Sequence, residues 1–132
     1  MIEKAAHRLV LVRLTLDMLR LVHTTYAPNE EPFGARMETL AVALCVALGT
    51  FEGKPFTATK IAAYLDMPRN SVVRRLKRLE RKWDAIERGP RSTYVMRAEI
   101  ANSSTALMAH QSIRRLLDDA MSQLHVLDKS AA

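Results

Sequence analysis

Two helical segments joined by a turn of three residues constrain the fold of this chain more than any other feature. The segment "ATKIAAYL" ends at Leu65, and Asp66, Met67 and Pro68 separate it from "RNSVVRRLKRLERKW". Aspartate tolerates the left-handed conformation that closes a helix, and proline fits the first turn of the next helix because its missing N–H costs nothing there. The sequence therefore predicts a helix, a tight turn and a second helix.

The second of these helices has two different sides. At about 100° per residue, its large apolar residues fall within about 60° of one another, and this side is expected to face the core. The opposite side is polar and strongly basic, so we expect it to be exposed. The apolar residues are Val72, Leu76, Leu79 and Trp83; the opposite side carries Asn70, Arg74, Lys77 and Arg81, with Arg78 beside them.

The middle of the chain holds the positive charge. Residues 54–97 contain twelve Lys and Arg against four acids, an excess of eight, whereas the whole chain carries +6. A basic middle between mildly acidic flanks indicates a polyanion as partner, and nucleic acid is the commonest one. A solvated surface that binds nothing gives the same charge pattern, so charge alone does not decide between them.

Two longer helices are expected before this motif. The first covers residues 3–26, and Pro28, Pro32 and Gly34 supply the breaks that end it. The second covers residues 36–48 and stops at Gly49. Its uncharged run is too short for a bilayer, which needs about 20 residues of helix, so it is interpreted as a buried helix.

The segments next to the paired helices are expected to be extended. Phe56 falls in a short extended segment, and the Thr57 hydroxyl can cap the helix that follows. Further on, strand-forming residues flank Gly89-Pro90, which predicts a hairpin with Arg88 and Arg91 at its tip. A last helix is expected from between 98 and 104 to about 127. The predicted fold class is mainly α with a small β-hairpin (α+β).

A pattern of apolar, hydroxyl and charged residues runs through the segment 37–96: Ile61, Ala62, Leu65, Ser71, Val72, Arg74, Leu79, Glu80, Ile86 and Arg88. In this pattern the segment resembles the winged helix-turn-helix core of the MarR-like family of bacterial transcription regulators. Two departures are visible: Asp84 stands where family members usually have Gly before the first wing strand, so it is expected to take the left-handed turn there, and the wing, "RGPRST", is short. The resemblance implies a homodimeric repressor whose dimer is built from the chain ends.

The second helix of the pair has the residue types that read duplex DNA. An arginine can bond guanine O6 and N7 together, and an asparagine can bond adenine N6 and N7, so side chains near the start of a helix in the major groove can select a sequence. Cations further along are expected on phosphates, which adds affinity rather than discrimination. The candidate base readers are Arg69, Asn70, Ser71 and Arg74; the candidate phosphate contacts are Lys77, Arg78 and Arg81, with Thr59 and Lys60 from the preceding helix and Arg88 and Arg91 from the wing.

The terminal helices, residues 3–26 and 99–127, are too apolar for one small domain to cover. Their apolar residues follow a four-three spacing, which is typical of helices that pack on other helices. They are interpreted as dimerisation helices, and packing within one subunit is the alternative. The candidate interface residues are Leu9, Val12, Leu16, Leu19, Ile113, Leu117, Leu124 and Leu127.

Other kinds of chemistry find no support in the sequence. The four histidines have no metal-ligand spacing, and no phosphate loop, catalytic triad or paired-carboxylate motif appears, so we expect no metal, no cofactor and no enzyme activity. Cys45, the single cysteine, lies in an apolar run and is expected to be a core residue. Charges at Arg13, Asp17 and Arg20 interrupt any signal peptide, and a lone cysteine suits a reducing cytoplasm.

The sequence is therefore interpreted as one domain of 132 residues, with a winged helix-turn-helix DNA-binding core at 37–97. The expected function is a cytoplasmic, sequence-specific regulator that binds a palindromic operator in double-stranded DNA as a homodimer. The rival interpretation is a winged-helix assembly module whose basic face docks an acidic protein partner. The sequence leaves open whether a small-molecule effector binds, as it does in many family members.

Overall fold

The computed structural model describes residues 1–26 and 32–131, and the predicted break at Pro28 lies outside them. The chain divides into two compact units. One unit combines the two ends of the chain, residues 1–26 and 104–132, and the other is formed by residues 27–103. The predicted class, mainly helical with a small antiparallel sheet, is confirmed.

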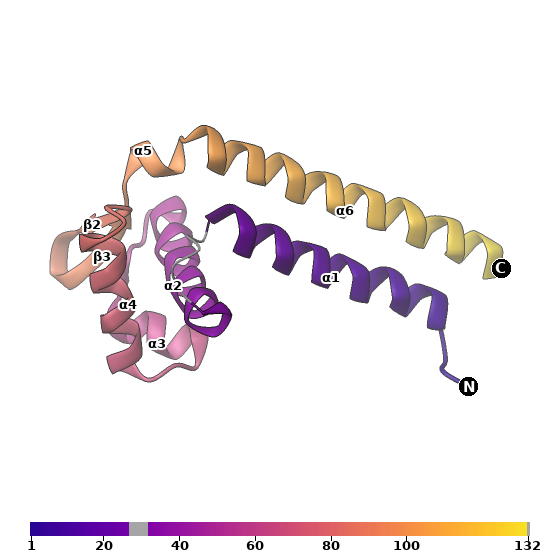
Figure 1. The fold of residues 1–132 in the computed structure, drawn as a ribbon, viewed down its shortest axis with the longest axis horizontal. Coiled ribbons are helices and arrows are strands. Elements are labelled where there is room, and N and C mark those ends of the chain that lie inside the picture. The colour runs from indigo at the N-terminus through magenta and orange to yellow at the C-terminus, as the bar shows by residue number, and fades with distance from the viewer. Residues whose placement is uncertain (27–31, 132) are drawn as a thin grey trace. The chain divides into compact units, whose positions relative to one another are not determined.

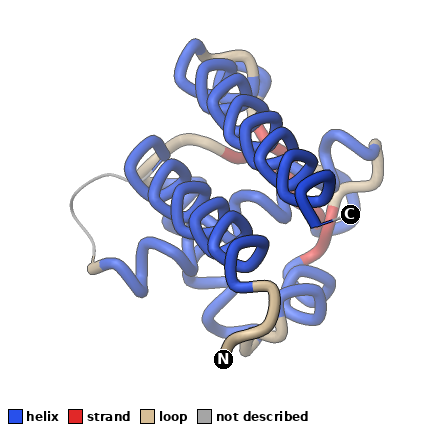
Figure 2. Tube along the Cα trace, turned by 90° about the vertical axis from the view of Figure 1, so that its right-hand side faces the viewer, coloured by secondary structure: helices blue, strands red, loops and turns tan. Residues whose placement is uncertain are grey.

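The first unit is an antiparallel pair of long helices, α1 (Ala5–Tyr26) and α6 (Ser104–Ala131). They run side by side for most of their length (Figures 1 and 2). Val10 of α1 and Ala106, Ala109 and Ala120 of α6 are buried. Alanines allow two helix backbones to approach closely, because only a methyl group separates them. The last helix continues past the predicted end near residue 127, and a separate short helix, α5 (Ala98–Ala101), precedes it.

The second unit is built around helix α2 (Phe33–Glu52), whose buried side includes Val42, Cys45 and Val46. By length and composition alone α2 could cross a membrane, but these three residues belong to the core cluster of the unit. The helix begins earlier and ends later than predicted. Gly34 lies within α2, so this glycine does not interrupt the helix.

Gly49 does not end α2, contrary to the prediction. A Cβ on this residue would lie 2.8 Å from Cδ1 of Phe56, so the glycine is there because Phe56 packs against the helix backbone. The helix ends at Gly53, which is left-handed with φ of 73°, and Thr50 uses its hydroxyl to accept the backbone N–H of Met96. The glycine needed for close packing and the glycine needed for the cap are therefore four residues apart.

The predicted pair of helices is present as α3 (Ala58–Leu65) and α4 (Arg69–Arg81). Thr57 caps α3 by accepting the backbone N–H of Lys60 at 3.2 Å, and Asp66 closes it in the left-handed conformation with φ of 53°. Pro68 lies at the N-cap of α4 rather than in its first turn. Ile61 of α3 is buried in the same core as α4.

A three-stranded antiparallel sheet completes the second unit. Its order is β1 (Phe56–Thr57), β3 (Thr93–Met96), β2 (Ile86–Arg88). The extended segment predicted at Phe56 is thus a strand, and it pairs with Tyr94, which the sequence did not indicate. Asp84 takes the left-handed conformation, φ 49°, that was expected where family members usually have glycine.

Candidate nucleic-acid interface

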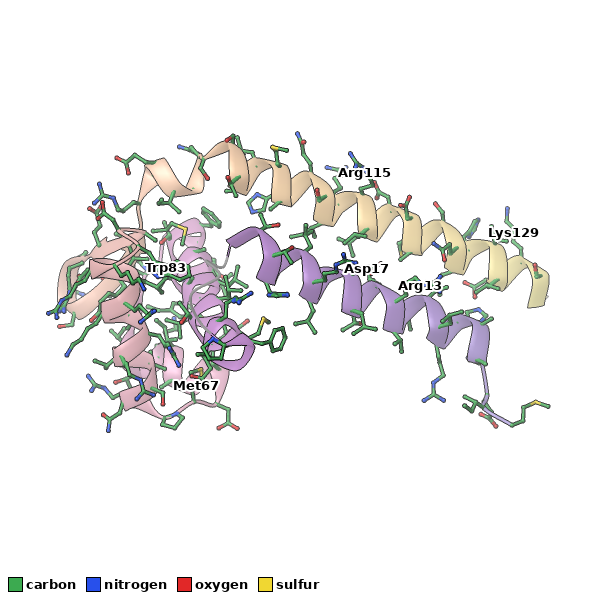
Figure 3. The ribbon with its side chains drawn as sticks, viewed as in Figure 1. Arg13, Asp17, Met67, Trp83, Arg115 and Lys129 are labelled. Carbon is green, nitrogen blue, oxygen red and sulfur yellow. The ribbon has the colours of Figure 1, made fainter. Side chains whose placement is uncertain are left out.

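Helix α4 separates a buried apolar side from an exposed polar side, as its periodicity predicted. Val72, Leu76 and Leu79 are at most 1% exposed. Trp83, just beyond the helix, is partly buried against the same core (Figure 3). The four residues of the opposite side are all exposed, and we call them the exposed face of α4. They are Asn70, Arg74, Lys77 and Arg81.

Arg69, the first residue of α4, is attached to the neighbouring helix. Its Nε donates to Oγ1 of Thr59 in α3 at 3.2 Å. Arg69 lies in the first turn of α4 and Thr59 in the first turn of α3, and both residues are exposed. Ser71, by contrast, is half-buried. Two of the predicted DNA-contact residues are therefore hydrogen-bonded to each other.

Lys60 follows Thr59 directly in the sequence, but its ammonium group contacts an aromatic ring rather than Arg69. The Nζ atom of Lys60 lies 4.3 Å from the centre of the Phe56 ring, a cation–π contact. Phe56 is itself buried in the core. Lys60 is an exposed residue that still presents its charge on the surface of α3.

The hairpin β2–β3 presents its two predicted arginines differently. Arg88 lies within β2 rather than at the tip, where its Nε donates to Oε2 of Glu80 at 3.2 Å and its guanidinium lies 5.1 Å from the Tyr94 ring centre. Arg91 is at the tip, exposed, in a turn where both it and Ser92 have positive φ, 58° and 60°. A left-handed conformation is costly for residues other than glycine, so this turn is strained.

The sequence did not indicate the surroundings of three further cations in α4 or directly after it. Arg78, a predicted phosphate contact, is half-buried and its Nε is enclosed. Arg75 was not a candidate; it donates from Nη2 to Oε2 of Glu38 in α2 at 3.1 Å. Lys82, exposed at the end of α4, was missed although it extends the run of cations.

The predicted dimer-interface residues divide into two groups. Leu9, Val12, Leu16 and Leu19 of α1 are exposed; we call these four the outer stripe of α1. On α6, Leu117 is exposed, but the other three candidates are half-buried in the described structure: Ile113, Leu124 and Leu127.

A groove lies along one side of the pair α1 and α6. Two hollows, of about 320 and 100 Å³, share Asp17 and Leu116 in their walls. Arg13 of α1 lines the smaller hollow together with Asp17 (Figure 3), and Arg20 lines the larger one. These charges therefore line the groove between α1 and α6 and do not belong to the outer stripe of α1.

No group of three or more potential metal ligands occurs among the described residues. Cys45 is buried, and burial raises the pKa of its thiol above the ordinary value of 9.0.

Compared with known proteins, the chain matches no family model, no curated protein and no solved structure.

Proposed function

We propose that the protein is a sequence-specific regulator of transcription that binds double-stranded DNA as a homodimer, with α3, the turn and α4 as a helix-turn-helix and β2–β3 as the wing. The observation that carries the proposal is the division of α4. Its apolar side is fully used by the core, and its exposed face consists of an amide and three cations. These residue types bond base edges and phosphates in a major groove.

The roles along α4 follow from position. Asn70 and Arg74 lie in the half of the helix that begins at its N-terminus, which is the part of a recognition helix that contacts bases. Lys77 and Arg81 lie in the second half and are assigned to phosphates. The resemblance to MarR-like regulators supports repression as the outcome of binding.

The outer stripe of α1 supports the dimer. Four large apolar side chains at 37% to 60% exposure repeat along one side of a 22-residue helix. A second copy would remove them from water and would place two recognition helices on one duplex. Half-sites read in this way lie about 34 Å apart or a multiple of that spacing.

The experiment is selection of bound sequences from a random duplex pool, followed by titration of the best site at several salt concentrations. A palindromic consensus, bound with an affinity that falls steeply with salt concentration, supports DNA binding, sequence specificity and dimerisation together. Arg74→Ala is expected to cost about 1–3 kcal/mol on the selected site and to relax the preference at one base pair. Arg81→Ala is expected to weaken all duplexes alike.

Failure to enrich any sequence, with no salt-dependent affinity for duplex DNA, would contradict the proposal. In that case the rival function, docking of an acidic protein partner on the same exposed face of α4, would account for the charge. Its signature is binding of an acidic protein, with loss of that binding in Arg74→Ala.

A further inference from the structure

The side chain of Arg69 is directed away from the other cations of α4. At about 100° per residue, Arg69 lies about 100° from Asn70 and about 140° from Arg74 around the helix. Its hydrogen bond to Thr59 draws it toward α3. Arg69 therefore belongs to the junction between the two helix starts and not to the exposed face of α4.

The acceptor that holds Arg69 is neutral, which distinguishes it from the arginines of the same unit that are held by carboxylates. Arg75, Arg88 and Arg97 bond the carboxylates of Glu38, Glu80 and Asp84, so much of their charge is compensated. The hydroxyl of Thr59 fixes one nitrogen of Arg69 and compensates none of its charge. Within residues 1–26 and 32–131, Thr59 is the acceptor of Arg69 and it takes only the Nε–H, so the N–H groups of both terminal nitrogens remain for another acceptor.

A guanidinium that is held through Nε and presents its terminal nitrogens suits an anion with oxygens on one side, such as a phosphate of the DNA backbone. Contacts of this kind fix the register of a protein on the duplex and carry no sequence information. A base reader would instead have to extend with Asn70 and Arg74 along the exposed face.

We propose that Arg69 binds a backbone phosphate rather than a base edge, and that Thr59 is a positioning residue that acts through Arg69 rather than a phosphate contact of its own. The proposal rests on the proposed function and changes the roles that the sequence alone suggested for these two residues. It leaves base recognition on α4 to Asn70 and Arg74.

The variants Arg69→Ala and Arg69→Lys distinguish a phosphate contact of Arg69 from a base contact. We expect Arg69→Ala to weaken binding about tenfold on specific and random duplexes alike, to lower the salt dependence by about one counterion, and to return the same consensus in a selection. Arg69→Lys keeps the charge, so most of the salt dependence is retained. A consensus that loses its preference at one base pair in Arg69→Ala would overturn the phosphate assignment.

Thr59→Val and Thr59→Ser test the positioning role. Valine removes the acceptor without changing the charge, and we expect a loss of about three- to tenfold, the equivalent of one hydrogen bond; serine restores wild-type affinity. In an Arg69→Ala background, Thr59→Val should have no further effect. An unchanged affinity in Thr59→Val, or full additivity of the two substitutions, would overturn the proposal.

Two measurements keep these outcomes distinct from other failures. Both positions are exposed, so each variant should unfold at the wild-type temperature, and circular dichroism checks this. If the wild-type protein binds no duplex, the proposed function and this assignment fall together. If the wild type binds and only the Thr59 and Arg69 results disagree, the assignment alone is wrong.

Discussion

The Nε of Arg88 donates to Oε2 of Glu80 at 3.2 Å, and this contact joins strand β2 to helix α4. The guanidinium of Arg88 also lies over the Tyr94 ring of strand β3. One arginine thus connects the proposed recognition helix to both strands of the hairpin. Under the proposed function this contact has a cost, because Glu80 compensates a charge that a DNA phosphate would otherwise meet.

Glu80→Gln is expected to raise affinity for any duplex a few-fold and to steepen its salt dependence by up to about one counterion. Its effect on stability should be within about 1 kcal/mol, since the pair is partly exposed. Glu87→Gln is the matched control, because it removes the same charge from the neighbouring strand position. Equal gains in both variants would mean that net charge alone matters and that Arg88 is not released.

Leu16→Glu tests the proposed dimer without disturbing the helix pair, because Leu16 is 60% exposed in the single chain. A carboxylate enclosed in an apolar interface costs several kcal/mol, so we expect a folded monomer with much weaker operator binding. Light scattering gives the mass. Thr15→Glu, on an exposed neighbouring residue outside the outer stripe, should remain dimeric. A wild type that is monomeric at micromolar concentration would contradict the interface.

Leu124→Glu is expected to act differently from Leu16→Glu. Leu124 is half-buried in the unit that contains α1 and α6, so a carboxylate there should destabilise the helix pair itself. Loss of helical signal at a lower temperature than in Leu16→Glu, measured by circular dichroism, checks this difference. Equal thermal stability of the two variants would show that Leu124 is not needed for packing α1 on α6.

Ser92→Gly is expected to stabilise the protein by about 1 kcal/mol, because Ser92 has φ of +60° in the hairpin turn and glycine adopts this conformation without steric cost. Urea unfolding measures the gain. Ser92→Ala keeps the strain and should show no such increase. A gain in both variants would point to loss of the hydroxyl and not to relief of backbone strain.

The thiol of Cys45 is expected to make the free energy of unfolding depend on pH at the alkaline end. Because its pKa is raised in the folded protein, the unfolded chain loses this proton first as pH increases. The contribution of Cys45 to the free energy of unfolding is constant below 9.0, the pKa of the thiol in the unfolded chain. Above that pH the contribution decreases, by up to about 1.4 kcal/mol per pH unit. The difference between wild type and Cys45→Ala, measured in urea between pH 7 and pH 10 (about three units), isolates this group from lysine and tyrosine titration.

Local signals in the sequence predicted the parts of this fold that depend on single residues. The cap at Thr57 and the left-handed residue Asp66 were expected from residue type and position, and the left-handed residue Asp84 was expected from the resemblance to a family that has glycine there. Gly49 was misinterpreted because its partner, Phe56, comes close only through the tertiary fold. A glycine that ends a helix and a glycine that admits an aromatic ring have the same appearance in a sequence.

For the candidate site, too, the sequence predicted features of single helices but not contacts between them. The period of α4 identified its exposed face, since burial follows directly from the helical repeat. The contacts that modify individual cations could not be predicted, because Glu38 lies 37 residues from Arg75 and Thr59 lies 10 residues from Arg69. Which arginines are compensated therefore depends on how the helices pack.

The pairing of α1 with α6 joins the two most distant parts of the chain, as the contact of 2.7 Å between His7 and Asp128 illustrates. During synthesis on the ribosome, α1 emerges before the unit formed by residues 27–103, and α6 emerges after it. Throughout that interval the apolar residues of α1 cannot pack against α6. We therefore expect the order of translation to expose α1 to premature association with neighbouring nascent chains.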